Sequence, residues 1–257
     1  MKYKKLLLLI TSLIFFTALF CSFFAVFKTA EIFVCCKQIE NSPEDLSNST
    51  KVLLEKYHNK NLVFINKDKL KNEIESLSGY IKVDDIDKKF PNKLNVYISE
   101  RKEEYAIKLL NGYLIVDSEY KVLKVNDKNC NNVDNLPLIE FNVNVADYDE
   151  TIIKQGTRFT LYDTATNNVL STLSTYLKNR RQNVKSITIN VRSDGKLNRF
   201  LTFEMAEGVI IQIDKVDENT VEKLEKLFNY YDTLENKGDI VKKYVTKLES
   251  GDIVVLG

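Results

Sequence analysis

The N-terminal part of the chain carries an apolar run that extends from Leu6 to Phe27 without a charged residue, a proline or a glycine. As a helix rising about 1.5 Å per residue it would be roughly 33 Å long, and the hydrocarbon core of a bilayer is roughly 30 Å thick. A backbone that crosses lipid must satisfy its hydrogen bonds internally. The run therefore predicts a transmembrane helix over residues 6–27.

The charges that flank this run predict its orientation. Three of the first five residues are lysines, whereas Lys28 is the only basic residue that follows closely, with Glu31 just beyond. Positive residues favour the cytoplasmic side of a span. We therefore expect residues 1–5 to form a cytoplasmic tail and everything after the span to lie outside the cytoplasm.

Three other interpretations of this run are weaker. A cleaved signal peptide has a shorter apolar core and a small-x-small cleavage site, and the candidate site Lys28-Thr29-Ala30 has a charge at a position that should be small. Lipidation at Cys21 would need a small residue where Phe20 stands. A buried core helix is a poor explanation for an all-apolar run of this length at the N-terminus. We expect an anchor that stays in the mature protein.

Past the anchor, the pattern of apolar positions predicts the order strand, helix, helix, strand, strand. The expected elements cover residues 31–39, 42–58, 66–79, 80–90 and 93–101, with a short extended piece over 62–65 between the helices. Asn66 is the expected N-cap of the second helix, and Pro91-Asn92 is the expected turn between the last two strands. Because the apolar positions before this turn change phase, we expect a β-bulge near Asp84-Asp85.

The remaining chain mixes strands with two helices. Asn111-Gly112 is a strong hairpin signal between strands over 105–110 and 113–116. The other expected elements are strands over 121–125, 138–145 and 187–191, helices over 161–177 and 221–234, and hairpins of 199–205 with 209–213 and 241–248 with 253–256. The fold class is therefore α+β, ending in a mixed α/β region with an extended antiparallel sheet.

The last predicted hairpin suggests a way to bind a partner. A chain of hairpins that ends on a strand leaves an unpaired edge, and such an edge can accept a strand from another protein through backbone hydrogen bonds. This is a prediction about interaction and not about catalysis.

Composition limits the partners of the exterior region. The chain has 257 residues and a formal net charge of +1, whereas binding to nucleic acid needs a clustered basic surface. The roughly 230 residues outside the membrane are enough for one or two modest domains. We therefore expect folded exterior domains with no nucleic-acid partner.

The candidate catalytic and metal-binding residues have simpler explanations. The eight glycines are scattered, so no phosphate-binding loop is expected. The single histidine, His58, ends a predicted helix, and the basic residues 178–181 end another, where a cation favours the helix dipole. Asp84 and Asp85 are neighbours on a strand, so their carboxylates point to opposite faces.

The cysteines do not predict a metal site either. The four cysteines are Cys21, Cys35, Cys36 and Cys130, and no CxxC motif occurs. We therefore predict no catalytic residue, no metal, no cofactor and no small-molecule substrate, and hence a protein that is not an enzyme.

One segment permits a more specific interpretation. Residues 90–101, FPNKLNVYISER, resemble the conserved "fPn-l-i-v-x-Er" segment of the FtsQ/DivIB family of bacterial cell-division proteins. Upstream, residues 61–65 stand where that family has "g-N-i-f-x-i". The downstream segments that also fit are 105–107, 112–117, 121–123 and 136–139. Departures occur at Glu103 and Tyr120, where relatives often have proline and glycine, and the glycine that usually follows the Leu-Pro segment is absent.

The resemblance implies an architecture and a role. The expected parts are a cytoplasmic tail over 1–5, a transmembrane helix over 6–27, a POTRA domain (β-α-α-β-β) over 31–101 and a β domain over 102–257 that ends in a C-terminal strand. Proteins of this family are non-enzymatic scaffolds at the division septum that bind FtsB/DivIC and FtsL partners and help control septal peptidoglycan synthesis. We expect the same of this chain, anchored in the bilayer through 6–27.

The resemblance also implies where partners bind. In the family the last strands of the β domain contact the partner by strand addition, and the corresponding stretch here is 244–256. The expected contact residues are Tyr244, Val245, Lys247, Leu248, Glu249, Gly251, Ile253 and Val254. Two alternatives stay open: an anchored extracytoplasmic cell-wall enzyme, and a chaperone or sensor that only shares the POTRA module.

Overall fold

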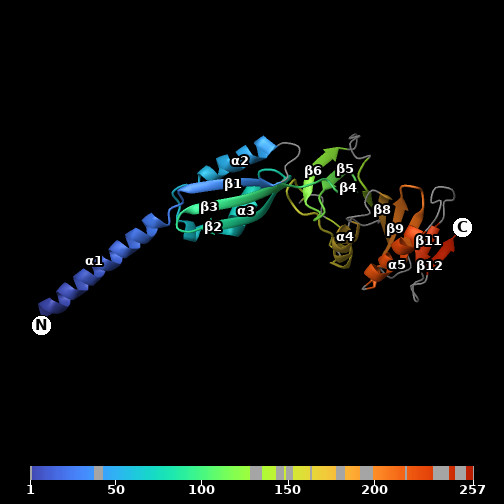
Figure 1. The fold of residues 1–257 in the computed structure, drawn as a ribbon. Helices are drawn as coiled ribbons and strands as arrows, with labels where there is room; N and C mark the ends of the chain where they lie inside the picture. The colour runs from blue at the N-terminus through green and yellow to red at the C-terminus, as the bar shows by residue number, and fades with distance from the viewer. Residues whose placement is uncertain are drawn as a thin grey trace. The chain divides into compact units, whose positions relative to one another are not determined.

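The computed structural model divides the chain into two compact units, Met1–Arg101 and Lys102–Gly257 (Figure 1). The residues that it describes are 2–37, 43–127, 135–142, 148, 153–162, 164–177, 183–191, 199–217, 219–233, 243–246 and 253–256.

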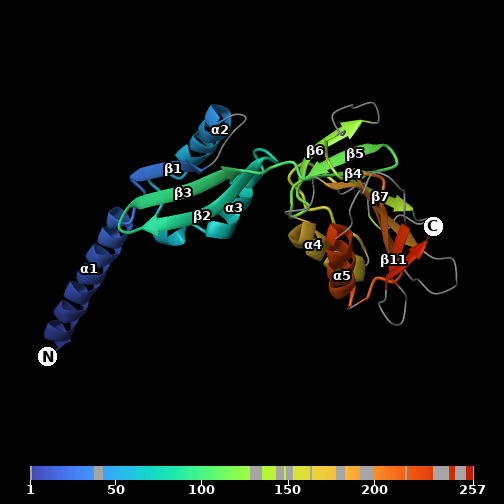
Figure 2. The ribbon, with the colours of Figure 1, turned by 45° about the vertical axis from the view of Figure 1, so that its right-hand side comes forward.

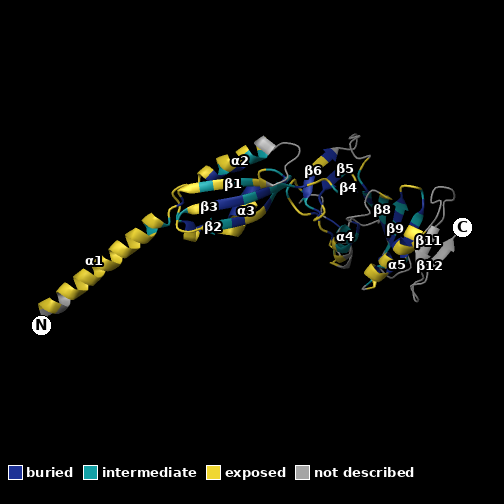
Figure 3. Cartoon of the chain, in the orientation of Figure 1, coloured by how far each residue is buried: buried dark blue, intermediate teal, exposed yellow. Residues whose placement is uncertain are grey.

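Helix α1 (Lys2–Val26) has a mostly apolar sequence and is exposed along most of its length (Figure 3). Its segment Leu7–Val26 is long and apolar enough to cross a membrane. The hydroxyls of Thr11, Thr17 and Ser22 each donate to a carbonyl one turn earlier in the same helix, so these groups need no partner in lipid. The helix is compatible with a single-pass membrane protein.

The rest of the described part of the first unit is a three-stranded sheet with two α-helices and a short 3₁₀ helix. Its elements are β1 (Glu31–Lys37), α2 (Pro43–Glu55), the short 3₁₀ helix η1 (Leu62–Phe64), α3 (Lys67–Glu75), β2 (Ile81–Lys89) and β3 (Lys93–Glu100). The strand order is β1-β3-β2. Strand β3 is parallel to β1 and antiparallel to β2, which gives the expected β-α-α-β-β arrangement.

The core of this sheet follows the alternation of β3. Leu94, Val96 and Ile98 are at most 1% exposed, and they pack in one cluster with Leu70 and Ile74 of α3. The pairing of β2 with β3 shifts register between residues 83 and 85, which confirms the predicted bulge. The predicted N-cap is also confirmed, because the Asn66 side chain accepts a hydrogen bond from the Lys69 backbone N–H at 3.0 Å.

Two local predictions in this unit were wrong. The apolar run Leu62–Phe64 forms a 3₁₀ turn and not an extended piece, because the Asn61 side chain accepts from the Val63 N–H at 2.9 Å and starts a turn. Helix α3 ends at Glu75, with Ser76 as its C-cap, instead of at Gly79. Leu77 therefore lies outside the helix and is 41% exposed.

Among its described residues, the second unit is one nine-stranded sheet with two helices. Its strands are β4 (Tyr105–Lys108), β5 (Gly112–Val116), β6 (Val122–Asp127), β7 (Leu138–Asn142), β8 (Val184–Val191), β9 (Arg199–Met205), β10 (Ile210–Ile213), β11 (Lys243–Thr246) and β12 (Ile253–Leu256). Their order in the sheet is β12-β11-β10-β9-β8-β7-β4-β5-β6. Helices α4 (Thr164–Tyr176) and α5 (Thr220–Thr233) lie side by side, with the Tyr176 and Phe228 rings 5.6 Å apart (Figure 2).

The α+β class is confirmed, with one refinement of the sheet. The predicted hairpins are present as antiparallel pairs, but β4-β7, β7-β8 and β10-β11 are parallel. A parallel pair needs a long crossover connection; α4 stands in the β7–β8 connection and α5 in the β10–β11 connection. The sheet is therefore mixed and not purely antiparallel.

Candidate partner-binding edge

The C-terminal edge of the large sheet is held in place by helix α5. Asp217 and Thr220 form a turn at the start of this helix, in which the Thr220 hydroxyl accepts from the Asp217 N–H at 2.8 Å. The Asp217 carboxylate also pairs with Lys223 Nζ at 2.8 Å. The apolar face of α5 buries Leu224 and Phe228 completely. The helix thus returns the chain across the sheet, so that β11 can run parallel to β10.

A buried tyrosine fixes the other end of α5. Tyr231 is 1% exposed, and its hydroxyl donates to the Glu207 carboxylate at 2.7 Å. Burial raises the pKa of Tyr231, and the hydrogen bond to Glu207 raises this pKa further. The tyrosine therefore stays protonated at neutral pH and ties α5 to the turn between β9 and β10.

Strands β11 and β12 form the last hairpin of the sheet. In β11, Tyr244 pairs with Ile211 of β10 on one side and with Val255 of β12 on the other. Strand β12 pairs with β11 alone among the described strands. Alternate residues of such an outer strand direct their N–H and C=O groups away from the sheet, so β12 can accept a further strand.

The structure divides the predicted contact residues into three groups. Ile253 and Val254 lie on the outer strand β12, whereas Tyr244 and Val245 lie on β11, whose backbone is paired on both sides. The predicted contacts Lys247, Leu248, Glu249 and Gly251 lie outside the described residues. Backbone strand addition is therefore geometrically open to the first group and closed to the second.

The opposite edge of the sheet is partly covered. In β6, the Val122 N–H donates to the Thr157 carbonyl at 2.8 Å, and the Gly156 N–H donates to the Val122 carbonyl at 2.7 Å. Just before β6, the backbone of Lys121 forms an isolated antiparallel β-bridge with that of Arg158. A covering segment of this kind blocks pairing with another chain, so the start of β6 is less suited to strand addition than β12.

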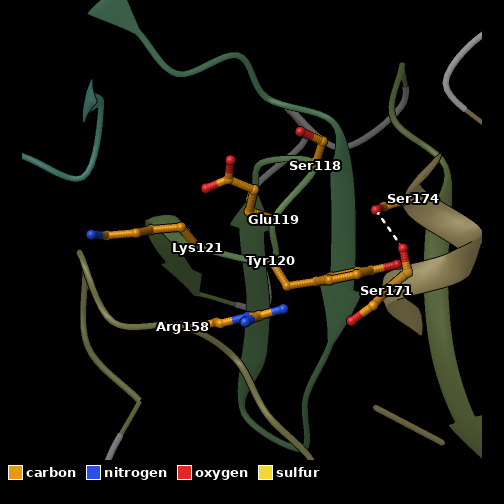
Figure 4. A pocket seen from close by; sticks show the side chains of 7 residues that line it. All are labelled: Ser118, Glu119, Tyr120, Lys121, Arg158, Ser171 and Ser174. Carbon is orange, nitrogen blue, oxygen red and sulfur yellow. Dashed lines mark hydrogen bonds between the residues drawn. The ribbon is translucent and has the colours of Figure 1, made fainter. Parts of the chain in front are cut away.

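A polar pocket lies beside this covered edge (Figure 4). It has a volume of about 260 Å³. The lining residues are Ser118, Glu119, Tyr120, Lys121, Arg158, Ser171 and Ser174. Two of its hydroxyls are bound to backbone carbonyls, because Tyr120 donates to Leu170 at 2.8 Å and Ser174 donates to Ser171 at 2.9 Å.

Tyr120 is a poor candidate for a catalytic base in this pocket. Burial holds the pKa of Tyr120 well above its ordinary value, so the phenol is a poor base near neutral pH. The described lining contains no cysteine or histidine to serve as a nucleophile or base. The part of the chain that the structure describes also contains no group of three or more His, Cys, Asp or Glu placed to hold a metal ion.

The comparisons with known proteins agree with the first unit of the structure. An apolar N-terminal helix followed by a β-α-α-β-β domain is compatible with a single-span membrane protein that carries a POTRA module. The family model described as "POTRA domain, FtsQ-type" matches residues 47–101. With the N-terminal apolar helix, this domain fits the FtsQ/DivIB family. A search of curated proteins found no match to the chain.

The matched domain limits the function at a coarse level. An FtsQ-type POTRA domain supports a role associated with cell division, and the family is generally non-enzymatic. The match ends at Arg101, so it does not include the sheet that contains β12.

Proposed function

We propose that the protein is a non-enzymatic scaffold of the bacterial division machinery, held in the cell membrane by α1 and concentrated at the division septum. Its N-terminus lies in the cytoplasm and both folded units lie outside. It binds FtsB/DivIC-like and FtsL-like single-span proteins and helps control septal peptidoglycan synthesis. The FtsQ-type POTRA match over residues 47–101 is the observation that carries this proposal.

The proposed contact is strand addition to β12. This strand is paired on one side among the described strands, and its neighbour β11 is held by the α5 crossover. Shared membrane anchoring confines the protein and its partners to one surface, which raises their effective concentration. A short strand contact is therefore sufficient to join proteins that are already close together.

Proline substitutions on β12 test this contact. Val254 and Val255 are consecutive, so one backbone N–H faces β11 and the other faces outward. Proline removes the N–H at either position. Val254→Pro and Val255→Pro therefore form a matched pair: one lowers the stability of the hairpin, and the other blocks the partner strand.

The measurement is the affinity of the full chain in nanodiscs for the FtsB/DivIC-like and FtsL-like pair, together with its thermal stability. We expect proline at the position whose backbone N–H points away from β11 to weaken binding by about tenfold or more, which is ~1.4 kcal/mol. This substitution should change the thermal stability little. Val125→Ser on β6, where the valine is 55% exposed, is the control and should bind normally. Unchanged affinity in both proline variants would contradict the proposed contact.

A further inference from the structure

The junction between α1 and the first exterior domain is built from backbone hydrogen bonds. Thr29 is fully buried; its N–H donates to the Lys60 carbonyl at 2.8 Å, and its carbonyl accepts from the Asn59 N–H at 2.9 Å. The Leu62 N–H donates to the Phe27 carbonyl at 2.7 Å, and the Ala30 N–H donates to Asn92. The anchor therefore leads into the domain without a free linker.

Aromatic rings continue from the anchor onto two loops of the domain. The Phe64 ring of η1 stacks on Phe24 with centroids 5.9 Å apart and an interplanar angle of 29°. The Phe90 ring, before the β2–β3 turn, meets Phe27 edge to face at 5.7 Å. Phe24 lies within the candidate span Leu7–Val26, about 3 Å before its end at ~1.5 Å per residue. Phe64 is thus placed at the depth of the last turn of the span.

These rings belong to an exposed apolar patch, defined here as Val63, Phe64 and Phe90. The exposed fractions of the three side chains are 39%, 66% and 58%. Large aromatic side chains that stay exposed together beside an apolar helix mark a contact surface. The patch continues the apolar surface of α1, so whatever surrounds the end of the helix also meets the patch.

Lysines flank this patch. Lys28 follows Phe27, Lys89 precedes Phe90 and both lysines are exposed, and Lys88 Nζ donates to the Val63 carbonyl at 3.2 Å. Burial lowers the pKa of Lys88, and the nearby charge of Lys67 lowers it further. Lysines next to exposed aromatic rings suit a membrane surface, because the rings enter the boundary between headgroups and acyl chains while the ammonium groups meet lipid phosphates.

We propose that this patch is a lipid-contact surface, which rests in the interfacial layer of the bilayer and fixes the orientation of the POTRA domain on the membrane. The inference rests on the proposed anchoring by α1 and goes beyond the binding of division partners. Continuity with the span favours lipid over a protein partner, since Phe64 stacks on a ring of the span itself.

The sequence makes the test direct because the chain contains no tryptophan. Four single-tryptophan variants of the full chain, reconstituted in nanodiscs with and without brominated acyl chains, report contact with lipid by quenching. Phe64→Trp and Phe90→Trp place the probe on the patch. Phe20→Trp places it in the span as a positive control. Leu77→Trp is the negative control, because Leu77 follows α3 at the end of the domain away from η1 and is 41% exposed.

We expect Phe64→Trp and Phe90→Trp to emit at shorter wavelength than Leu77→Trp and to be partly quenched in brominated lipid, because apolar groups of an interfacial surface reach the acyl boundary. Phe20→Trp should be quenched more strongly. If Phe20→Trp is quenched but both patch variants behave like Leu77→Trp, the lipid-contact proposal is wrong while the anchor stands. If Phe20→Trp is not quenched, the anchoring itself is wrong and the proposal is lost with it.

Discussion

At the scale of single residues, a buried ion pair links separate elements of the POTRA domain. Arg101 and Glu75 have side chains that are 4% and 6% exposed, and Arg101 Nη2 lies 3.3 Å from Glu75 Oε1. The same carboxylate oxygen accepts from the Val83 N–H at 3.1 Å, and Arg101 Nε donates to the Ile81 carbonyl at 3.4 Å. The pair thus joins the end of α3 to the start of β2, at the last residue of the matched family segment.

Removing one partner of this pair should be strongly destabilising. Arg101→Met leaves the Glu75 carboxylate buried without its guanidinium, and such changes cost about 3–5 kcal/mol. The free energy of unfolding, measured by denaturant in detergent micelles, should fall by this amount. Lys108→Met is the control, because the Lys108–Glu140 pair is exposed and such pairs contribute at most about 1 kcal/mol. Equal losses in the two variants would contradict the structural role of Arg101.

Two stacked tyrosines in the core of the second unit should differ in how much stability is lost when each is replaced by phenylalanine. Tyr105 and Tyr120 have ring centroids 5.7 Å apart. The Tyr120 hydroxyl donates to Leu170 at 2.8 Å, whereas the buried Tyr105 hydroxyl has no hydrogen-bond partner among the residues described. Tyr120→Phe should therefore cost about 1 kcal/mol of unfolding free energy, and Tyr105→Phe should be neutral or stabilising. A loss in Tyr105→Phe as large as that in Tyr120→Phe would show that the Tyr105 hydroxyl is bound.

The raised pKa of Tyr105 predicts that the free energy of unfolding depends on pH. Burial raises the pKa of Tyr105 from 10.0 to about 12. Above pH 10 the unfolded chain releases this proton while the folded chain keeps it, so the stability that it contributes is full below pH 10 and is lost as the pH rises toward 12. Denaturant unfolding at about pH 8 and about pH 11 should show a smaller alkaline loss in Tyr105→Phe than in the parent chain. An identical loss in both chains would contradict the assignment to Tyr105.

At the scale of elements, the sequence predicted local features better than it predicted which strands pair. The Asn66 cap, the bulge after Val83 and the hairpins depend on neighbouring residues, and the sequence was sufficient for them. The parallel pairs of the large sheet join strands that are distant in the chain, and no periodicity specifies which strands meet. For this reason the sequence alone could not show that β11, with Tyr244 and Val245, lies between β10 and β12.

Some contacts were beyond sequence reasoning for a different reason. The Glu75–Arg101 pair joins residues whose side chains are usually exposed, so composition alone favours a surface position for both. The 3₁₀ turn at Leu62–Phe64 came from a short apolar run, which periodicity cannot distinguish from a strand. The Asn61 side chain, placed to accept from the Val63 N–H, was the available signal.

The cap of α3 gives a prediction at this scale. Asn66→Ala removes the side-chain acceptor of the Lys69 N–H and should cost about 1 kcal/mol of unfolding free energy. Asn72→Ala, at an exposed position inside the same helix, should be neutral or slightly stabilising because alanine has the higher helix propensity. Denaturant unfolding of both variants measures the difference. Similar effects from the two substitutions would show that the cap does not stabilise α3.

At the scale of the whole molecule, the two units differ in how they serve the proposed scaffold. The POTRA domain is joined to α1 by backbone hydrogen bonds and carries the family match. The nine-stranded sheet carries the outer strand β12, which is proposed for partner binding. The proposed membrane anchoring and the proposed partner binding thus fall on different units of one chain.

Amide hydrogen exchange of the full chain in nanodiscs, with and without the FtsB/DivIC-like and FtsL-like pair, tests the proposed scaffold most directly. A partner strand added to β12 would pair with the backbone groups that point away from β11. We predict that the pair slows exchange in residues 253–256, while exchange in β6 stays unchanged. Unchanged exchange in 253–256 in the presence of the bound pair, or new protection confined to β6, would contradict binding at this edge.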